Sequence, residues 1–554
     1  MTNNRRLPCR GTRWCFAFFL TCISVLLATT SKADQFGDFT YVTNGSTATV
    51  IITAYTGAGD SVIVPGTIVG LPVTSIGDSA FASTGLTSVT LPNSVTSIGR
   101  AAFYRCTALT GVSLPSSVSR IGESAFGACL GLTSITFPGV TSIGLFAFAA
   151  CTGLTSVTLP NTLTDLGGAA FFECIGLTNV AIPSSVTSIG DSPFNSCSGL
   201  MAITVDALNP NYSSADGVLF DKAQELLIQY PGGKVGSYSL PDSVTIIGDS
   251  AFYGCAELTS VTLPSVTSIG VLAFQDCTGL TDVTLPNSLT SIGVQAFLDT
   301  GLTSIAIPRS VTNIEEQTFA FTKLPSVTVP NSITQLKDRM FRGCPGLTTV
   351  ILSENLTIIG DYIFQDNSEQ GVEAVTGVYF KGNAPTNVGT AAFRGANNAT
   401  IYYRAGTTGW GSTLAGRPTA LWVVPTYSQW AASYDLPTQY PNASGPQDDA
   451  ERDGLTNIQE MEAGTDPTAA GSALRLEQQP RPNDLTESDK TPPGPNQFAL
   501  YFQSVPGKIY ELQSTPTLGS PWKSASTVIA TTTQKRVLMS KPASKGFYRV
   551  LLSP

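Results

Sequence analysis

The feature that most constrains this chain is a unit of 22 or 23 residues that recurs along most of its length. The unit reads L-T-S-V-T-L-P-x-S-V-T-S-I-G-x-x-A-F-x-x-C-x-x. A fixed period of this size is typical of repeat architectures, in which one unit cannot bury its own apolar side chains and neighbouring units bury them jointly. The leading leucine marks the copies: Leu86, Leu109, Leu132, Leu154, Leu177 and Leu200, then Leu258, Leu280, Leu302, Leu324 and Leu347.

The spacings within the unit predict its local structure. Val112 and Leu114 lie two residues apart, which predicts a short strand with its apolar side chains inward. Pro115 ends this strand because proline has no N–H to donate to a ladder. Gly122 is expected to supply a turn, and Phe126 to place a ring inside the coil. The sequence therefore predicts a repeat solenoid of about 13 coils with short parallel strands, roughly 60 Å long at a strand spacing of about 4.8 Å.

Eight cysteines follow the motif phenylalanine by three residues, one in each of eight units. Thr84, Thr300 and Thr322 take the same position in other units, so the position accepts any small side chain. We therefore expect buried free thiols that pack as small hydrophobic groups. Disulfides between adjacent coils are the alternative in a secreted protein, because the coil spacing permits the Cα distance. The eight are Cys106, Cys129, Cys151, Cys174, Cys197, Cys255, Cys277 and Cys344.

The repeat resembles the BspA-type leucine-rich repeat of bacterial surface proteins over about residues 48–424. The segments Asn209-Pro210-Asn211-Tyr212 and Val378-Tyr379-Phe380-Lys381-Gly382-Asn383 resemble features of the same family. The resemblance implies a leucine-rich-repeat solenoid on a secreted or cell-surface protein, and several family members bind host matrix proteins or other cells. It brings no shared catalytic motif, and a fold does not by itself define a function.

Residues 1–33 are predicted to be a secretory signal peptide. Four arginines between positions 5 and 13 precede an apolar stretch, Trp14 to Ala28, and Ser31-Lys32-Ala33 fits a cleavage site before Asp34. The alternative is a membrane anchor, but an apolar stretch of about 15 residues is short for a span that needs roughly 20. We expect a secreted or cell-surface chain without a transmembrane segment after cleavage.

Composition excludes several functions. The chain has no histidine, which rules out a Ser-His-Asp triad, a Cys-His pair and a histidine-ligated zinc. A net charge of −9 argues against binding to nucleic acid, whose phosphates need clustered lysine and arginine. A glycosidase would need two acids across a cleft, and we expect no such pair because the solenoid acids do not recur in one position of the unit. These acids include Glu123, Asp165, Asp191, Asp249, Asp276 and Glu315.

Two surface features carry alternative interpretations. Exposed pairs such as Ser88 and Thr90 form rows that suit a soluble half-exposed strand, or that could bind ice or a crystalline polysaccharide. An insertion at about residues 201–257 interrupts the repeat, with Val218-Leu219-Phe220 and Leu226-Leu227-Ile228 expected to form a hairpin. The insertion is either a binding face or a second, degenerate coil with a solvated loop.

After the solenoid, which we assign to residues 34–424, the composition predicts linkers at 425–447 and 469–496. Between them, residues 448–468 closely follow the pattern of a calcium loop, D-x-[DN]-x-[DN]-G-x5-E, but Glu451 stands at position 3 in place of the usual Asp or Asn. The segment also resembles thrombospondin-type-3-like calcium modules. The alternative is an acidic turn that caps a helix. The predicted Ca²⁺ ligands are Asp449, Glu451, Asp453, the carbonyl of Leu455, and Glu460.

Residues 497–554 are predicted to form a small all-β module. Its expected strands are Phe498–Phe502, Ile509–Gln513, Val528–Thr531 and Phe547–Leu552. Such a module would either attach the chain to a surface or only cap it.

The sequence as a whole favours a non-catalytic, adhesin-like protein that binds a protein or glycan ligand on a cell surface or matrix. A structural envelope or surface-layer component is the alternative, and a polysaccharide-binding protein is a third possibility.

Overall fold

The computed structural model describes residues 33–365 and 375–422, together with five strands between residues 497 and 552. The chain divides into two compact units, Met1–Ala420 and Leu421–Pro554. The described residues form strands and turns and contain no helix. The signal peptide apart from its last residue, the calcium motif and both predicted linkers lie outside the described residues.

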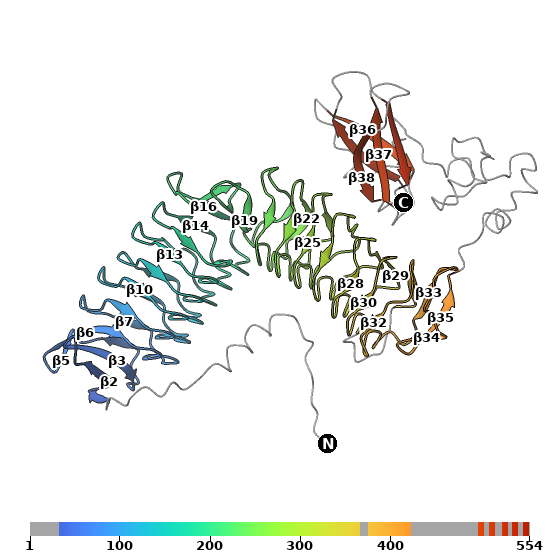
Figure 1. The fold of residues 1–554 in the computed structure, drawn as a ribbon. Helices are drawn as coiled ribbons and strands as arrows, with labels where there is room; N and C mark the ends of the chain where they lie inside the picture. Colours follow the sequence, from blue (N-terminus) through green and yellow to red (C-terminus); the bar gives the residue numbers. More distant parts are fainter. Residues whose placement is uncertain are drawn as a thin grey trace, which may run out of the picture. The chain divides into compact units, whose positions relative to one another are not determined.

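The first unit is a succession of stacked coils. Most coils have a longer and a shorter strand, and neighbouring coils pair in parallel and in register (Figure 1). For example, Val112 lies opposite Val89 on one side and Ile135 on the other. The longer strands are β4 (Ser61–Ile63), β7 (Ser88–Thr90), β9 (Gly111–Ser113), β11 (Ser134–Thr136), β14 (Asn179–Ile182), β16 (Ala202–Val205), β20 (Gly236–Ser239), β22 (Leu258–Thr262), β24 (Asp282–Thr284), β27 (Ser326–Thr328), β29 (Thr349–Leu352), β31 (Gly377–Phe380) and β33 (Thr400–Tyr403).

The shorter strands form the second column of the coils. They are β8 (Ser97–Ile98), β10 (Arg120–Ile121), β12 (Ser142–Ile143), β13 (Asp165–Leu166), β15 (Ser188–Ile189), β21 (Ile246–Ile247), β23 (Ser268–Ile269), β25 (Ser291–Ile292), β26 (Asn313–Ile314), β28 (Gln335–Leu336), β30 (Ile358–Ile359) and β32 (Asn387–Val388). The predicted leucine-rich-repeat solenoid of short parallel strands is therefore confirmed.

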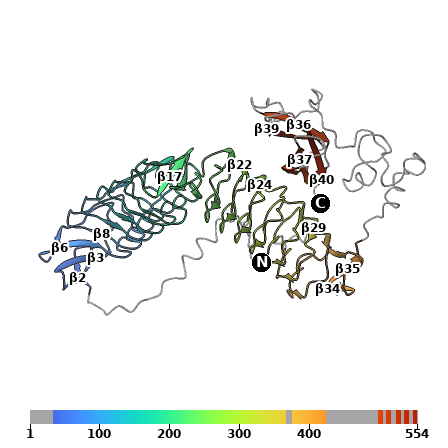
Figure 2. The same cartoon turned by 45° about the horizontal axis from the view of Figure 1, so that its top comes forward.

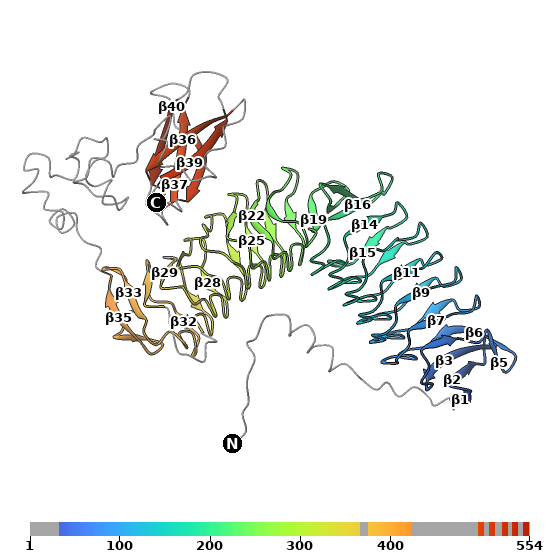
Figure 3. The ribbon, with the colours of Figure 1, turned by 180° about the vertical axis from the view of Figure 1, so that it is seen from behind.

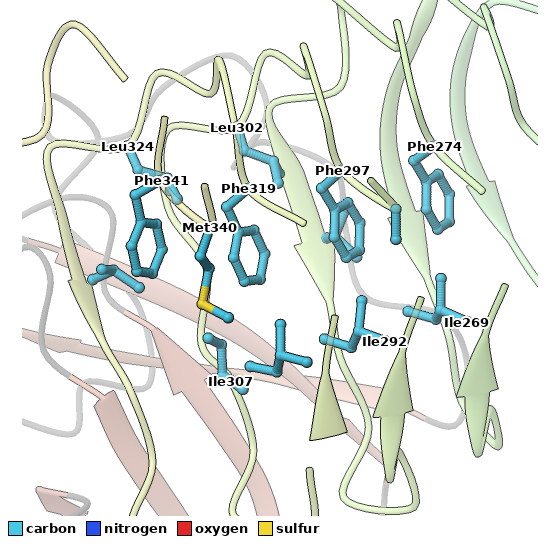
Figure 4. Close-up of a cluster of buried hydrophobic side chains, with 14 of the residues drawn as sticks. Ile269, Phe274, Ile292, Phe297, Leu302, Ile307, Phe319, Leu324, Met340 and Phe341 are labelled. Carbon is cyan, nitrogen blue, oxygen red and sulfur yellow. The ribbon is translucent and has the colours of Figure 1, made fainter. Parts of the chain in front are cut away.

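An aromatic column runs through the core of the solenoid. Its rings are stacked with centroids 4.6 Å apart at Phe252–Phe274 and 6.1 Å apart at Phe341–Phe364. Figure 4 shows part of this column beside a column of isoleucines from the shorter strands. The prediction of about 13 coils is close, because the column has fourteen members: Phe81, Phe103, Phe126, Phe148, Phe171, Phe194, Tyr230, Phe252, Phe274, Phe297, Phe319, Phe341, Phe364 and Phe393.

The glycine after each shorter strand has a different role from the predicted turn. Gly122 does not have a positive φ. A Cβ there would lie 2.7 Å from the carbonyl carbon of Gly99, and one at Gly144 would lie 2.7 Å from that of Gly122. Side chains are therefore excluded because successive backbones approach too closely. Where Glu315 and Lys337 take this position, the pairing of shorter strands breaks between β26 and β28.

All eight repeat cysteines are free and buried, so the prediction of packed thiols is confirmed and the disulfide alternative is wrong. Each thiol donates to the carbonyl of the aromatic residue one coil earlier, for example Cys129 Sγ to Phe103 O at 3.1 Å. Burial raises the pKa of Cys151 and of Cys197 to about 12. The thiolate, which is the reactive form, is therefore strongly disfavoured.

We expect the folded chain from Asp34 to Pro554 to resist thiol-specific labelling. Burial and the raised thiol pKa should leave fewer than about one of the eight thiols modified by a disulfide reagent in an hour at pH 8. The measurement is the absorbance of the released thiol, and unfolding in guanidinium should release all eight. Rapid stoichiometric labelling of the folded chain would contradict the packing described here.

Threonine hydroxyls consolidate the stack from outside the core. Thr164 Oγ1 donates to the carbonyl of Thr141 at 3.0 Å, and Thr290 Oγ1 donates to that of Thr267 at 2.9 Å. At these recurring positions the threonine hydroxyl donates to a backbone carbonyl of the preceding coil. This structural role explains why threonine recurs there. On the longer strands, Thr136 Oγ1 donates to Ser113 Oγ at 3.1 Å.

Antiparallel strands close both ends of the solenoid. At the first end, Tyr55 stacks on Phe81 with centroids 5.3 Å apart, which covers the open end of the aromatic column. At the other end, Trp410 packs edge-on against Phe380. The closing strands are β1 (Asp34–Phe36), β2 (Phe39–Asn44), β3 (Thr49–Tyr55), β5 (Thr67–Ile68) and β6 (Leu71–Ile76), then β34 (Thr413–Leu414) and β35 (Arg417–Leu421).

The second unit contains five antiparallel strands, in agreement with the predicted all-β module. β36 (Gln497–Gln503) pairs with β39 (Gln534–Ser540). β37 (Ile509–Thr515) lies between β38 (Lys523–Ile529) and β40 (Phe547–Leu552). The strand expected at Val528–Thr531 is the end of β38, and β39 was not predicted.

Candidate functional site at the insertion

The insertion builds one further coil and a hairpin. β17 (Tyr212–Ala215), β18 (Val218–Asp221) and β19 (Leu226–Gln229) form an antiparallel meander, and β19 then pairs in parallel with β21. Tyr230 takes the aromatic position of this coil and stacks on Phe252, with ring centroids 4.9 Å apart. The predicted hairpin and the degenerate coil are therefore both present. The predicted strand Val218–Phe220 is fully buried, and the loop at 206–211 before the hairpin is largely exposed.

β18 divides the hydrophobic core into two parts. Leu219 packs in the core of the coils before the insertion. Val218 and Phe220, which point the opposite way from the strand, pack in the core of the coils after it. Figures 2 and 3 show this meeting point from two sides, with β17 in Figure 2 and with β15, β16 and β19 in Figure 3. We call the region where the two cores meet, residues 189–192, 201–236 and 246–249, the junction.

The coil that carries Tyr230 is shorter than the others. In the other coils five positions separate the last core residue of the shorter strand from the aromatic residue, as from Ile189 to Phe194, but only three separate Leu227 from Tyr230. The turn that normally follows the shorter strand is therefore missing two residues. Its neighbours on both sides lose the backbone groups with which they would normally pair.

Side chains replace the missing backbone. The N–H of Phe194 donates to Gln229 Oε1 at 3.3 Å, where other coils use a backbone carbonyl. Gln229 Nε2 donates in turn to Asn195 Oδ1 at 3.1 Å. Ser192 Oγ reaches over the missing turn to the carbonyl of Asp249 at 2.8 Å. The buried polar groups at the junction are thereby satisfied, as burial requires.

A second polar anchor holds the loop that leads into the hairpin. The side chain of Asn209 is fully buried. Its Nδ2 donates to the carbonyls of Pro183 and Val186, both at 2.9 Å, and its Oδ1 accepts from the N–H groups of Asn211 and Tyr212. The loop is therefore fixed to the preceding coil, which leaves Leu208 beside it 83% exposed.

The missing turn leaves a cleft of about 520 Å³. Its floor is apolar and comes from the shorter strands, including Ile189, Leu226 and Ile246. Its sides carry the carboxylates of Asp191, Asp221 and Asp249, and no lysine or arginine lines it. The cleft therefore combines an apolar floor with an acidic rim.

Asp191 and Asp249 occupy the same position of the repeat, directly after the recurring glycine that follows the shorter strand. Glu123 shares this position, so the expectation that the acids do not recur in one position is wrong for these three. The position has a structural use: Asp78 Oδ1 accepts from the N–H of Arg100 in the next coil at 2.8 Å. Asp249 accepts in the same way from Val271 at 2.7 Å.

Exposed apolar side chains concentrate around the junction. Twelve large hydrophobic residues of the described chain are exposed, and five of them lie between residues 201 and 271. Isolated exposed apolar residues are ordinary, but a concentration of them in one part of the chain is typical of an interaction site, and one of the five, Ile246, lines the cleft. The five are Met201, Leu208, Val235, Ile246 and Val271.

The predicted calcium ligands, Asp449, Glu451, Asp453, Leu455 and Glu460, lie outside the described residues. Within the described residues, no group of three or more histidine, cysteine, aspartate or glutamate side chains is placed to hold a metal ion. The same residues include no helix able to cross a membrane.

Elsewhere on the solenoid, two aspartates lie at the same position of adjacent coils. Asp276 and Asp299 follow the aromatic residue by two positions in adjacent coils. Burial raises the pKa of Asp276, a hydrogen bond from Tyr253 opposes this, and the charge of Asp299 adds to the increase. One carboxylate oxygen of Asp276 is buried without a hydrogen-bond partner. This carboxylate therefore destabilises the fold at neutral pH.

We expect Asp276→Asn to stabilise the chain by about 1 kcal/mol at pH 7, because the amide removes a poorly solvated charge. The folded pKa is raised, so the folded state binds the proton more tightly, and the wild-type chain recovers stability as the pH falls. The gain from the substitution should thus shrink between pH 7 and pH 4 in urea unfolding curves. Asp282→Asn, at an exposed position, is the control, and an equal gain there would contradict this assignment.

Comparison with known proteins agrees with this architecture. Residues 74–204 and 245–370 match the model of the BspA type leucine rich repeat region, with six copies. The two matched ranges flank the hairpin and its coil, and the chain belongs to this leucine-rich-repeat family. No curated protein matches the chain in sequence.

Solved structures of bacterial leucine-rich-repeat proteins are similar to the chain. A leucine rich cell surface protein from Faecalibacterium prausnitzii is 30% identical, with 64% of this chain and 96% of that chain covered and a TM-score of 0.48. The pneumococcal vaccine antigen PcpA is 18% identical, with 72% and 100% covered and a TM-score of 0.48. A leucine-rich repeat protein from Eubacterium ventriosum is 21% identical, with 69% and 96% covered and a TM-score of 0.44.

Proposed function

We propose that this chain is a secreted or cell-surface, adhesin-like protein whose solenoid binds a protein ligand at the junction. The observation that carries the proposal is the junction itself, which contains a cleft lined by apolar and acidic residues and four of the twelve exposed large hydrophobic residues. Membership of a leucine-rich-repeat surface-protein family supports the same role.

The way in which the junction holds its exposed apolar residues favours a binding role over a purely structural one. Three exposed apolar residues lie next to segments that are fixed to the rest of the fold. Met201 precedes β16, Leu208 precedes the buried Asn209, and Val235 follows Lys234, which donates to the carbonyl of Asp216 at the tip of the hairpin. For example, the N–H of Ile203 donates to the carbonyl of Gly217 at 2.8 Å. Rigid presentation of apolar side chains lowers the entropy lost on binding.

The test compares two triple variants of the chain from Asp34 to Pro554 on arrays of matrix proteins, glycans and bacterial envelope fractions. The junction variant replaces the exposed residues Met201, Leu208 and Val235 by serine. The control variant replaces Ile63, Val69 and Leu130, which are exposed far from the insertion in sequence, by serine.

We expect saturable binding of the wild-type chain to a protein ligand, weakened at least about tenfold in the junction variant and unchanged in the control variant. Equal effects of the two variants would contradict the assignment of the site. Calcium-dependent self-assembly without any bound ligand would contradict the adhesin-like role and favour an envelope scaffold. Binding to a glycan alone would favour a polysaccharide-binding protein.

We also propose that the acidic motif at 448–468 binds one Ca²⁺ in a structural role. Carboxylates at loop positions 1, 3, 5 and 12, with a carbonyl at position 7, provide the oxygen ligands that this ion prefers. Calorimetric titration of the full chain with Ca²⁺ should show one site, which is lost in Glu460→Gln and kept in Asp282→Asn. Absence of a heat of binding when Ca²⁺ is added to the wild-type chain would overturn this assignment. The ligands would be Asp449, Glu451, Asp453, Leu455 and Glu460.

A further inference from the structure

Asp191 is the one aspartate at its position of the repeat that has lost its normal partner. At this position Asp78, Asp249, Asp338 and Asp361 each accept an N–H from the next coil, at 2.7 to 2.9 Å. In the coil after Asp191 the corresponding turn is missing, and the Asp191 carboxylate makes no hydrogen bond or ion pair with any described residue. Both of its oxygens are therefore available at the rim of the cleft.

Each of the other two carboxylates of the cleft already accepts hydrogen bonds through one of its oxygens. Asp221 Oδ1 accepts the N–H groups of Glu225 and Leu226, at 2.8 and 3.0 Å. Asp249 Oδ1 accepts the N–H of Val271. These bonds fix the two side chains while leaving their charge uncompensated, because the lining contains no basic residue. Lys222, next to Asp221, donates its ammonium to the carbonyls of Asn209 and Ala207.

The floor of the cleft sets a second requirement on its occupant. Ile189, Ile228 and Ile246 offer apolar surface in the same cleft as the carboxylates. A hydrated metal ion would leave this surface uncovered, and no described residues form a metal-binding group of three ligands. An arginine side chain satisfies both requirements, since its methylene stem covers apolar surface while its charged end stays at the rim.

We propose that the junction cleft binds the side chain of an arginine residue of the protein ligand, with its guanidinium on Asp191 and its stem on the isoleucine floor. The planar guanidinium pairs with a carboxylate that has two free oxygens through two parallel hydrogen bonds, which favours arginine over lysine. Asp249 and Asp221 add negative charge on the same rim. This inference rests on the proposed function and names the chemistry of the partner at the same site.

The experiment uses the tripeptide acetyl-Gly-Arg-Gly-amide as the probe and saturation-transfer NMR on the chain from Asp34 to Pro554. The peptide with citrulline in place of arginine is the matched control, because citrulline has nearly the same shape without the charge. We expect transfer to the arginine methylenes, no comparable transfer to citrulline, and weaker binding at 500 mM salt than at 50 mM. Asp191→Asn should weaken binding about three- to fivefold, as expected for an exposed charge pair.

Asp78→Asn is the matched variant, because Asp78 occupies the same position of the repeat with its carboxylate engaged. It should leave peptide binding unchanged. Absence of binding, equal binding of the citrulline peptide, or equal effects of the two variants would overturn the inference. Equal affinity for a third peptide, acetyl-Gly-Lys-Gly-amide, would overturn the choice of arginine.

The outcomes separate this inference from the proposed function. If the junction triple variant loses binding to a protein ligand while the arginine peptide neither binds nor competes, the junction remains the site and only the arginine assignment fails. If neither the protein arrays nor the peptide show binding at the junction, both fail together.

Discussion

Replacement of Phe220 by alanine should destabilise the chain by about 3–5 kcal/mol, the largest effect we expect from a single substitution in the insertion. Phe220 is fully buried on β18, in the core of the coils that follow the hairpin. The cavity left behind cannot collapse easily, because the backbone of β18 is paired on one side with β17 and on the other with β19. Urea unfolding of the variant measures the effect.

The matched substitution is Leu219→Ala on the opposite side of the same strand. Leu219 packs in the core of the preceding coils, so its loss should lower amide protection mainly before residue 205, whereas loss of Phe220 should lower it mainly after residue 225. Hydrogen exchange followed by mass spectrometry distinguishes the two. The same pattern of lost protection in both variants would contradict the division of the core by β18.

Gly144→Ala should destabilise the chain by about 2–3 kcal/mol, although glycine to alanine often stabilises a protein. The added Cβ would lie 2.7 Å from the carbonyl carbon of Gly122 and 2.8 Å from the N of Glu123, so two coils would have to separate. Gly85→Ala is the control, because a Cβ there meets no atom within 4 Å. Thermal unfolding should show a large loss for the first variant and a change within about 0.5 kcal/mol for the second.

The regular part of the solenoid was predictable because each buried position recurs. The alternation of Val112 and Leu114 and the recurrence of a phenylalanine at the position of Phe126 indicated which side chains face inward. All three side chains are buried as expected. The interchange of cysteine with threonine indicated free thiols, and Thr84 and Cys106 indeed lie in contact in adjacent coils at 3.3 Å. A repeat makes such inferences strong, since every unit repeats the same physical constraints.

The role of the spacing glycine was not predictable from the pattern alone. A recurring glycine is equally consistent with a turn of positive φ and with close backbone approach. Only the structure shows that Gly122 faces the backbone of Gly99. Within the unit, positive φ occurs at other positions, such as those of Ser124 and Ala128, and the second of these is a glycine in some coils, as at Gly254.

The junction was predicted only in part. Its hairpin was visible as two apolar runs, but the sequence pattern does not show that Gln229 and Ser192 replace the backbone of a missing turn. One signal for the cleft was nevertheless present. The distance from Leu227 to Tyr230 is three positions where other units have five, and a comparison of this spacing across units would have located the gap.

The central claim, that the missing turn creates the binding site, is tested most directly by restoring it. The variant carries Gly-Asp inserted between Leu227 and Ile228, which returns the five-position spacing and should fill the cleft. The measurement is the affinity of this folded variant for the protein ligand of the wild-type chain. We predict an unchanged circular-dichroism spectrum and at least a tenfold loss of affinity. Undiminished binding by a chain whose cleft is filled would contradict the account.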